Sequence, residues 1–154
     1  MKIVVVIPIK ASTDPLLVLG QDYLKKTRLP LVIEPVFVPH KQQLDESQKS
    51  VSMDQEGALL LKKTEGYFRV ALTERGKSLT SEQLCQFLEK SSHHTSKMAF
   101  IIGGAFGLSP HVIQACNATL SLSPMTMPHR MAFAMLSEQL FRAGEIMNRT
   151  AYHK

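Results

Sequence analysis

The sequence has few cysteines and no metal-binding pattern. Its 154 residues include two cysteines, Cys85 and Cys116, which are too few for a disulfide framework. Both fall on apolar faces of segments that read as helices, so we expect two reduced, buried thiols. The six histidines form no H-x-x-x-H pair, and no C-x-x-C motif is present. We therefore expect no structural metal.

Aromatic residues and long apolar runs are also scarce. Aromatics make up 6% of the chain, with no tryptophan, which argues against a platform on which single-stranded bases stack. The apolar run at residues 3–9 is short, contains Pro8 and is followed by Lys10, so it is typical of a buried strand rather than of a signal peptide. No run is long enough to span a bilayer. We expect a cytoplasmic protein without a membrane partner.

The chain does have an excess of positive charge. Its formal net charge is +5, and the excess lies in residues 1–28 and 129–154. Such a distribution favours a polyanionic partner, bound in part through phosphate contacts. The candidate RNA-binding residues are Lys10, Lys25, Lys26, Arg130 and Arg142.

Strand-like and helix-like segments alternate along the chain. β-rich runs predict strands over residues 1–9, 31–38, 67–73, 98–103 and 119–122. Helices are expected over residues 15–26, within 41–63 after a polar loop, over 80–90, from 109 to about 118, and over 130–147. This alternation predicts a single α/β domain, residues 1–154, with a mostly parallel sheet.

Particular residues indicate helix ends and packing. Asp14 before a proline and Ser109 before another are typical N-caps, and Thr80 has the spacing of a capping box. Pro35 inside the second strand predicts an edge strand or a bend. In the second helix, the apolar spacing puts three residues on the inward face: Val51, Leu59 and Leu60.

Two loops are candidate ligand sites. Residues 103–107 read Gly-Gly-Ala-Phe-Gly between the fourth strand and a helix, a pattern that fits a tight turn and a ligand-binding loop equally well. It is not a dinucleotide fingerprint, which needs G-x-G-x-x-G after the first strand. Residues 122–129 read Leu-Ser-Pro-Met-Thr-Met-Pro-His, a stiff segment that suits the wall of an adenine nucleoside pocket. Parallel sheets bind ligands at the carboxyl ends of strands, so we expect the site after Thr73, Gly103 and Leu122.

Four motifs occur in a fixed order: IGGAFGL at 102–108, LSLSPMTMPH at 120–129, EQLFRA at 138–143 and YHK at 152–154. In this order and spacing they resemble the ribosomal RNA large subunit methyltransferase H family of the SPOUT superfamily. The resemblance covers essentially the whole chain. It implies an α/β parallel-sheet SPOUT domain with a C-terminal trefoil knot, a homodimer, and S-adenosyl-L-methionine as cofactor. It also implies methylation of a pseudouridine ring nitrogen, N3, in 23S ribosomal RNA of the large subunit.

The resemblance also assigns roles to residues. It implies that the cofactor is bound by Leu72, Gly103, Gly104, Ser123, Pro124, Met125, Thr126, Met127 and Pro128. The catalytic candidates are Tyr152, His153, Lys154 and His129. The resemblance implies that the first three of these reach the active site across the dimer, although polar residues at the end of a sequence ordinarily fray. His153 suits a proton acceptor and Lys154 a phosphate contact.

Two positions depart from the family pattern. Thr73 stands where the family usually has an aspartate, and Phe133 stands where an arginine usually follows the histidine by four residues. These departures leave open a ribosome-binding or RNA-binding SPOUT protein with impaired catalysis. A transfer RNA methyltransferase of the same fold is a further alternative.

Overall fold

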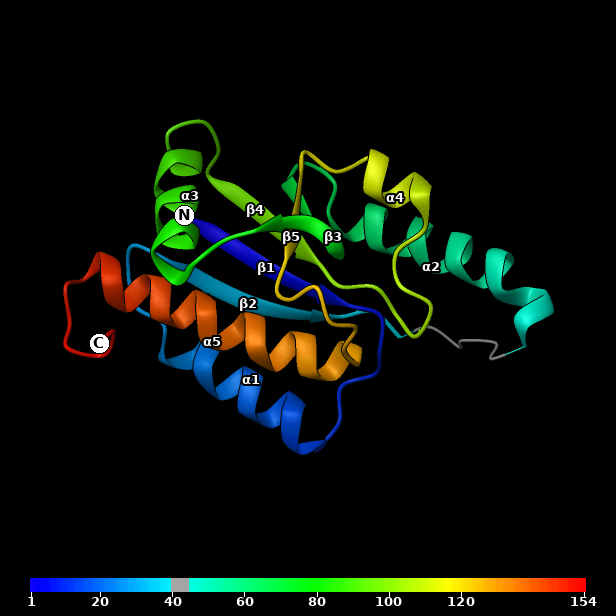
Figure 1. Ribbon diagram of the computed structural model, residues 1–154, viewed down its shortest axis with the longest axis horizontal. Helices are drawn as coiled ribbons and strands as arrows, with labels where there is room; N and C mark the ends of the chain where they lie inside the picture. Colours follow the sequence, from blue (N-terminus) through cyan, green and yellow to red (C-terminus); the bar gives the residue numbers. More distant parts are fainter. Residues whose placement is uncertain (40–44) are drawn as a thin grey trace.

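The computed structural model describes residues 1–39 and 45–154. Residues 41–44, the start of the polar loop expected before the second helix, lie outside this part of the chain. The strands are β1 (Lys2–Ile7), β2 (Val32–Phe37), β3 (Phe68–Ser78), β4 (Lys97–Ile101) and β5 (Ala118–Ser121). They form one sheet in the order β2-β1-β4-β3-β5, and all four neighbouring pairs run parallel. The predicted parallel α/β sheet is confirmed (Figure 1).

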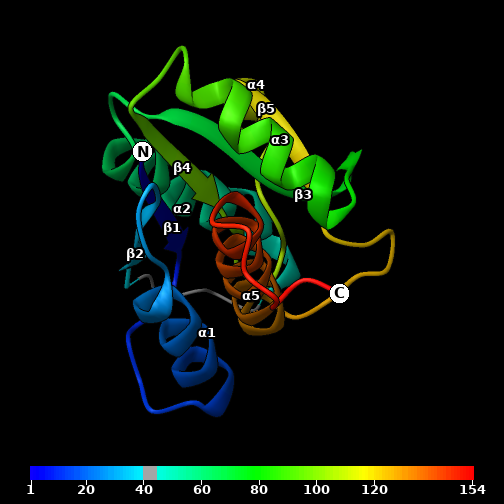
Figure 2. The same ribbon diagram turned by 90° about the vertical axis from the view of Figure 1, so that its left-hand side faces the viewer.

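Helices cover both faces of this sheet. They are α1 (Pro15–Lys26), α2 (Lys49–Lys63), α3 (Ser81–Ser92), α4 (Pro110–Gln114) and α5 (His129–Met147), and the short 3₁₀ turn η1 (Glu46–Gln48) precedes α2. The core on one face is built with side chains of α1, α3 and α5, and the core on the other with α2 and α4. Figures 1 and 2 show α1 and α5 lying side by side.

The strand β1 explains how the sequence produces these two cores. Ile3, Val5 and Ile7 pack into the α1/α3/α5 core, while Val4 and Val6 pack into the α2/α4 core. Because a parallel strand in the middle of a sheet is buried on both faces, it reads as a continuous apolar run. The first apolar run of the sequence is thus a buried strand, as expected.

Local signals for helix ends and strand position are confirmed. The Asp14 carboxylate accepts a hydrogen bond from the Leu16 amide (3.0 Å) at the start of α1. Thr80 and Gln83 form the reciprocal capping box of α3, with bonds of 3.2 and 2.9 Å. β2, which contains Pro35, is an edge strand of the sheet.

The inward face of α2 was predicted wrongly. Val51 is 53% exposed and Leu59 39% exposed, whereas Leu60 is buried as expected. The helix turns polar residues inward instead, among them Ser52 and Glu56. The spacing of apolar residues could not predict this face, because two of its buried side chains are polar.

Several element ends also differ from the expected positions. β3 runs to Ser78 rather than ending near Thr73, because it pairs with Leu120 of β5 twice, on either side of a register shift between Leu72 and Lys77. α4 ends at Gln114 instead of near residue 118. Cys116 therefore lies after the helix, half-buried, while Cys85 in α3 is buried; both thiols are free, as expected.

Candidate functional site

A cavity of about 360 Å³ opens beside the middle of β3 and the carboxyl ends of β4 and β5. Residues 72–74 within β3 and the segments that follow β4 and β5 line it, and the first turn of α5 contributes His129 and Ala132. The volume falls in the range of about 300–1,000 Å³ that is usual for small-molecule sites. The cavity lies at the three positions that the sequence predicted, next to Thr73, Gly103 and Leu122, although β3 continues beyond the first of them.

The glycine loop at residues 103–107 is folded tightly on itself. A Cβ at Gly103 would lie 2.5 Å from the carbonyl carbon of Gly107. Gly107 has a φ of 77° and donates its amide hydrogen to the Gly104 carbonyl at 3.0 Å. All five residues of the loop line the cavity. The tight turn is therefore confirmed. The same loop lines the cavity, and its role as a ligand-binding loop stays a prediction.

A buried carboxylate on α2 holds this loop in place. Oε1 of Glu56 accepts a hydrogen bond from the Gly104 amide at 2.8 Å, and the residue is only 4% exposed. Since this amide is already bonded, Gly104 offers a ligand its shape rather than a free N–H group. Sequence reasoning missed Glu56. Its one signal is an acidic residue four positions before the buried Leu60, on the same helix face.

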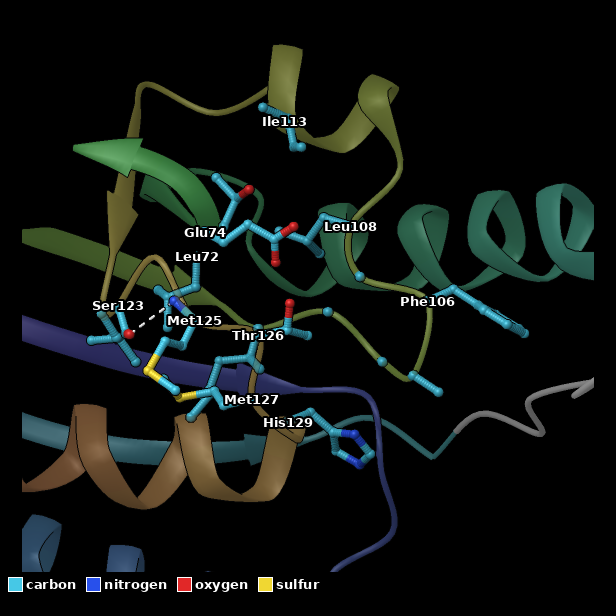
Figure 3. Close-up of a pocket in the computed structure, with 18 residues that line it drawn as sticks. Leu72, Glu74, Phe106, Leu108, Ile113, Ser123, Met125, Thr126, Met127 and His129 are labelled. Carbon is cyan, nitrogen blue, oxygen red and sulfur yellow. Dashed lines mark hydrogen bonds between the residues drawn. The ribbon is translucent and has the colours of Figure 1, made fainter. Parts of the chain in front are cut away.

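The segment from Leu122 to Pro128 is tied to the bulged part of β3. Oγ of the buried Ser121 lies within hydrogen-bond distance of the Ser123 carbonyl (3.0 Å) and the Glu74 carbonyl (3.2 Å). The Met125 amide donates to Oγ of Ser123 at 3.0 Å (Figure 3). The side chain of Met125 is 75% exposed, which puts it at the mouth of the cavity.

Most residues expected at the cofactor line this one cavity: Leu72, Gly103, Gly104, Ser123, Met125, Thr126 and Met127. Pro124 and Pro128 are exposed and do not line the cavity. They lie on either side of residues 125–127, which do line it. The structure adds Glu74, Phe106 and Ile113, which sequence reasoning missed. For Glu74 the available signal was its place directly after the third strand as predicted.

Two ionisable side chains, Glu74 and His129, line the cavity in the described part of the chain. Burial and the neighbouring Arg130 lower the pKa of His129 below its ordinary 6.5, so its ring is neutral at pH 7. Its Nε2 atom is buried and has no hydrogen-bond partner among residues 1–39 and 45–154. A neutral imidazole with a free ring nitrogen can bond to a ligand. Figure 3 shows His129 and Phe106 on the side of the cavity away from Ser123.

Comparison with known proteins identifies the family. A family model described as "Predicted SPOUT methyltransferase" matches residues 1–153. This chain belongs to the SPOUT methyltransferase family. It is 38% identical over 141 residues to "Ribosomal RNA large subunit methyltransferase H" of Symbiobacterium thermophilum, covering 87% of this chain and 88% of that protein. It is 36% identical over 138 residues to the protein of the same name from Exiguobacterium sibiricum, covering 86% and 87%.

A solved structure supports the fold. The chain matches a probable methylase family protein from Haemophilus influenzae Rd KW20 with a TM-score of 0.58 at 16% identity. The match covers 99% of this chain and 70% of that one. At this level of identity the similarity shows a shared fold and nothing more. Together, the family match and the five-stranded parallel sheet confirm the predicted α/β domain of the SPOUT type.

In this SPOUT methyltransferase the tail segment, which we define as Tyr152, His153 and Lys154, does not line the cavity. The Tyr152 hydroxyl donates to Glu138 at 3.0 Å, and its ring packs edge-on against Phe141 with centroids 4.9 Å apart. Burial, followed by the bond to Glu138, raises the pKa of Tyr152 to about 12. The tail segment is therefore held on α5 of its own chain.

The other two tail residues lie beside α3 and in solvent. Nε2 of His153 is 2.7 Å from Oε1 of Glu82, and Lys154 is exposed. The backbone amide of Glu82, and then His153, lower the pKa of the Glu82 carboxyl to about 2. The structure thus does not bring the four catalytic candidates together within one chain: His129 lines the cavity, and the tail segment lies elsewhere.

The SPOUT domain presents its basic residues in two ways. Three of the expected RNA-binding residues are exposed lysines: Lys10, Lys25 and Lys26. The two arginines are engaged with carboxylates. Arg130 lies 3.1 Å from Asp14, and Arg142 lies 2.5 Å from Glu138 on the next turn of α5. Phosphate binding by either arginine would require an exchange of partners.

The two departures from the family pattern have structural explanations. Phe133 is fully buried, with its ring centroid 5.9 Å from that of Phe37. A Cβ at Gly20 of α1 would lie 2.5 Å from this ring, so α1 approaches α5 closely at this point. Phe133 is a core residue and cannot contact RNA in this structure. Thr73 lines the cavity, and the next residue, Glu74, supplies a carboxylate there.

Residues 1–39 and 45–154 contain no cluster of three or more histidine, cysteine, aspartate or glutamate side chains suited to a metal ion. None of the helices in this part of the chain has the length and hydropathy needed to cross a membrane.

Proposed function

We propose that the chain is an S-adenosyl-L-methionine-dependent enzyme that methylates N3 of a pseudouridine in 23S ribosomal RNA of the large subunit. The observation that carries this proposal is the cavity at the strand ends, which is lined by the predicted cofactor residues in a chain of the SPOUT methyltransferase family. The names of its relatives from Symbiobacterium and Exiguobacterium support ribosomal RNA as the substrate.

The residues present fit the proposed cofactor. Leu72, Leu108 and Ile113 offer apolar surface for an adenine ring, and the backbone of residues 103–107 forms a wall without bulky side chains. The Glu74 carboxylate suits the cationic end of the molecule. The orphaned Nε2 of His129 suits a polar group of the cofactor or of the base.

For this reaction the protein has to position the two reactants and to accept the proton that the target nitrogen loses. A methyl group on a sulfonium is already a strong electrophile, so holding the two reactants in line supplies much of the rate. The target nitrogen of pseudouridine carries a proton that must leave before or during attack. A neutral histidine suits its acceptor, and a cation suits the developing negative charge. We propose His129 and the tail segment for these roles.

The position of the tail segment leads to a proposal for the oligomeric state. Because it packs away from the cavity of its own chain, its catalytic role needs a second copy, and we propose a symmetric homodimer. We further propose that residues 1–154 act as one cytoplasmic domain, with the C-terminal trefoil knot that the resemblance implies. Sedimentation at micromolar concentration tests the dimer, and a monomer with full activity would contradict it.

The RNA surface that we propose combines Lys10, Lys25 and Lys26 with Arg130 and Arg142. Phosphate contacts release counterions, so RNA affinity should fall steeply between low and moderate salt. An affinity that does not change with salt would contradict this surface. The structure favours the three exposed lysines as its main contributors, since both arginines already face carboxylates.

Transfer of a labelled methyl group tests the function. The protein is incubated with labelled S-adenosyl-L-methionine and, separately, with whole ribosomes, large subunits, naked ribosomal RNA and transfer RNA. We expect label in 23S RNA of at least one ribosomal substrate and none in transfer RNA. Label in transfer RNA alone would indicate the alternative methyltransferase. RNA binding without transfer would indicate an impaired, RNA-binding member of the family.

A further inference from the structure

We propose that Glu74 is the residue by which this site distinguishes the positively charged cofactor from its neutral product, S-adenosyl-L-homocysteine. This inference rests on the proposed function and deepens it. Glu74 is the one carboxylate among the residues that line the cavity in the described part of the chain. The other ionisable group there, His129, is neutral at pH 7 and provides no competing charge.

The backbone places Glu74 by means of the register shift in β3. Between Leu72 and Lys77 the strand leaves its partner β5 and then pairs with Leu120 again. The return is tight, because a Cβ at Gly76 would lie 2.5 Å from the carbonyl carbon of Leu120. The intervening residues therefore bulge from the sheet, and Thr73 and Glu74 reach the cavity.

Neighbouring contacts fix the backbone of this bulge, and within the described residues they leave the Glu74 carboxylate without an ion-pair partner. Oγ of Ser121 lies 3.2 Å from the Glu74 carbonyl, which fixes the backbone on the side of β5. Figure 3 shows the Glu74 side chain extending from β3 toward Leu108 across the cavity. No side chain of residues 1–39 or 45–154 forms an ion pair with it. The carboxylate is available to a cation in the cavity.

The cofactor and its product differ by the feature that a carboxylate detects. When the methyl group is transferred, the electron pair of the ring nitrogen forms the new N–C bond, the C–S bond breaks, and its pair stays on sulfur. The nitrogen-bound proton passes to a base. The sulfonium thereby becomes a neutral thioether, while the amino and carboxyl groups of the molecule are unchanged. A carboxylate beside the sulfur therefore loses its attraction at the moment when the product has to leave.

Calorimetry with the two ligands tests the assignment. Glu74→Gln keeps the shape of the side chain and removes its charge. We expect the affinity for S-adenosyl-L-methionine to fall about tenfold, with the affinity for S-adenosyl-L-homocysteine nearly unchanged. Glu74→Asp, which keeps the charge, should retain most of the discrimination. Glu65→Gln is the matched control, because it removes an exposed carboxylate that does not line the cavity.

The outcomes separate this inference from the proposed function. Equal losses for both ligands would place Glu74 at the amino group that they share and would overturn the inference while the cofactor assignment stands. The same change in discrimination in Glu65→Gln would also overturn it, since the effect would then be one of net charge. A wild-type protein that binds neither ligand would overturn both.

Discussion

The tight folding of the glycine loop at residues 103–107 leads to a quantitative prediction for Gly103→Ala. The added Cβ would lie 2.5 Å from the carbonyl carbon of Gly107 and 2.6 Å from the Leu108 nitrogen. Both neighbours are backbone atoms, so the loop has to move, at a cost of about 1–3 kcal/mol, as is typical of overpacking. For a domain of this size, a loss of 1 kcal/mol lowers the melting temperature by about 2–4 °C. We therefore expect a decrease of roughly 2–12 °C.

The same variant should bind the cofactor more weakly. All five residues of the loop line the cavity, so a displaced loop alters its wall. A loss of about tenfold corresponds to about 1.4 kcal/mol of contact free energy. Thermal unfolding followed by circular dichroism measures the first effect, and calorimetric titration with S-adenosyl-L-methionine the second.

Gly144→Ala is the matched control for this experiment. A Cβ at Gly144 of α5 would have Thr27 as its nearest neighbour, at an ordinary 3.4 Å, and alanine stabilises a helix by up to about 1 kcal/mol relative to glycine. We expect an unchanged or slightly higher melting temperature and unchanged cofactor affinity. A Gly103→Ala protein that melts and binds like the wild type would refute the constraint described for the loop.

Three further predictions concern the tail segment and His129. Removing residues 152–154 should leave the fold and cofactor affinity nearly intact and lower methyl transfer by roughly a hundredfold, the typical contribution of a general base; a rate equal to that of the full chain would show that the tail is dispensable. An absorbance titration should find one of the three tyrosines ionising at about 12, and Tyr152→Phe should remove that step; if the step persists, it belongs to another tyrosine and the raised pKa assigned to Tyr152 is wrong. The pKa of His129 is lowered by folding, so its contribution to stability is complete above pH 6.5 and is lost as the pH falls below that value. Urea unfolding at pH 7.5 and 5.5 should therefore show a smaller difference in His129→Gln than in the wild type, and an equal difference would contradict the burial of this ring.

The sheet and the place of the site could be predicted because they depend on local signals. Buried parallel strands appear in the sequence as apolar runs. Residues 103–107 lie between such a run and a helix signal, so they mark the end of a strand, where parallel sheets bind ligands. The caps at Asp14 and Thr80 depend on neighbours within three residues, which the sequence shows directly.

The rest depended on contacts between distant residues. Glu56 faces inward because it meets the Gly104 amide, 48 positions away, and no periodicity in α2 records that partner. The bulge that carries Glu74 arises from the double pairing of β3 with Leu120. The position of Tyr152 on Glu138 is likewise set by a contact that the polar character of the tail does not suggest.

Nucleoside analysis of the RNA product tests the central claim most directly. Large-subunit RNA or whole ribosomes are incubated with the protein and S-adenosyl-L-methionine carrying an isotopic methyl group, and the 23S RNA is digested to nucleosides and analysed by mass spectrometry. The account predicts that the label appears in a pseudouridine methylated at ring nitrogen N3, and that omission of the protein abolishes it. Label confined to any other nucleoside, or its absence from 23S RNA with every ribosomal substrate, would contradict the account.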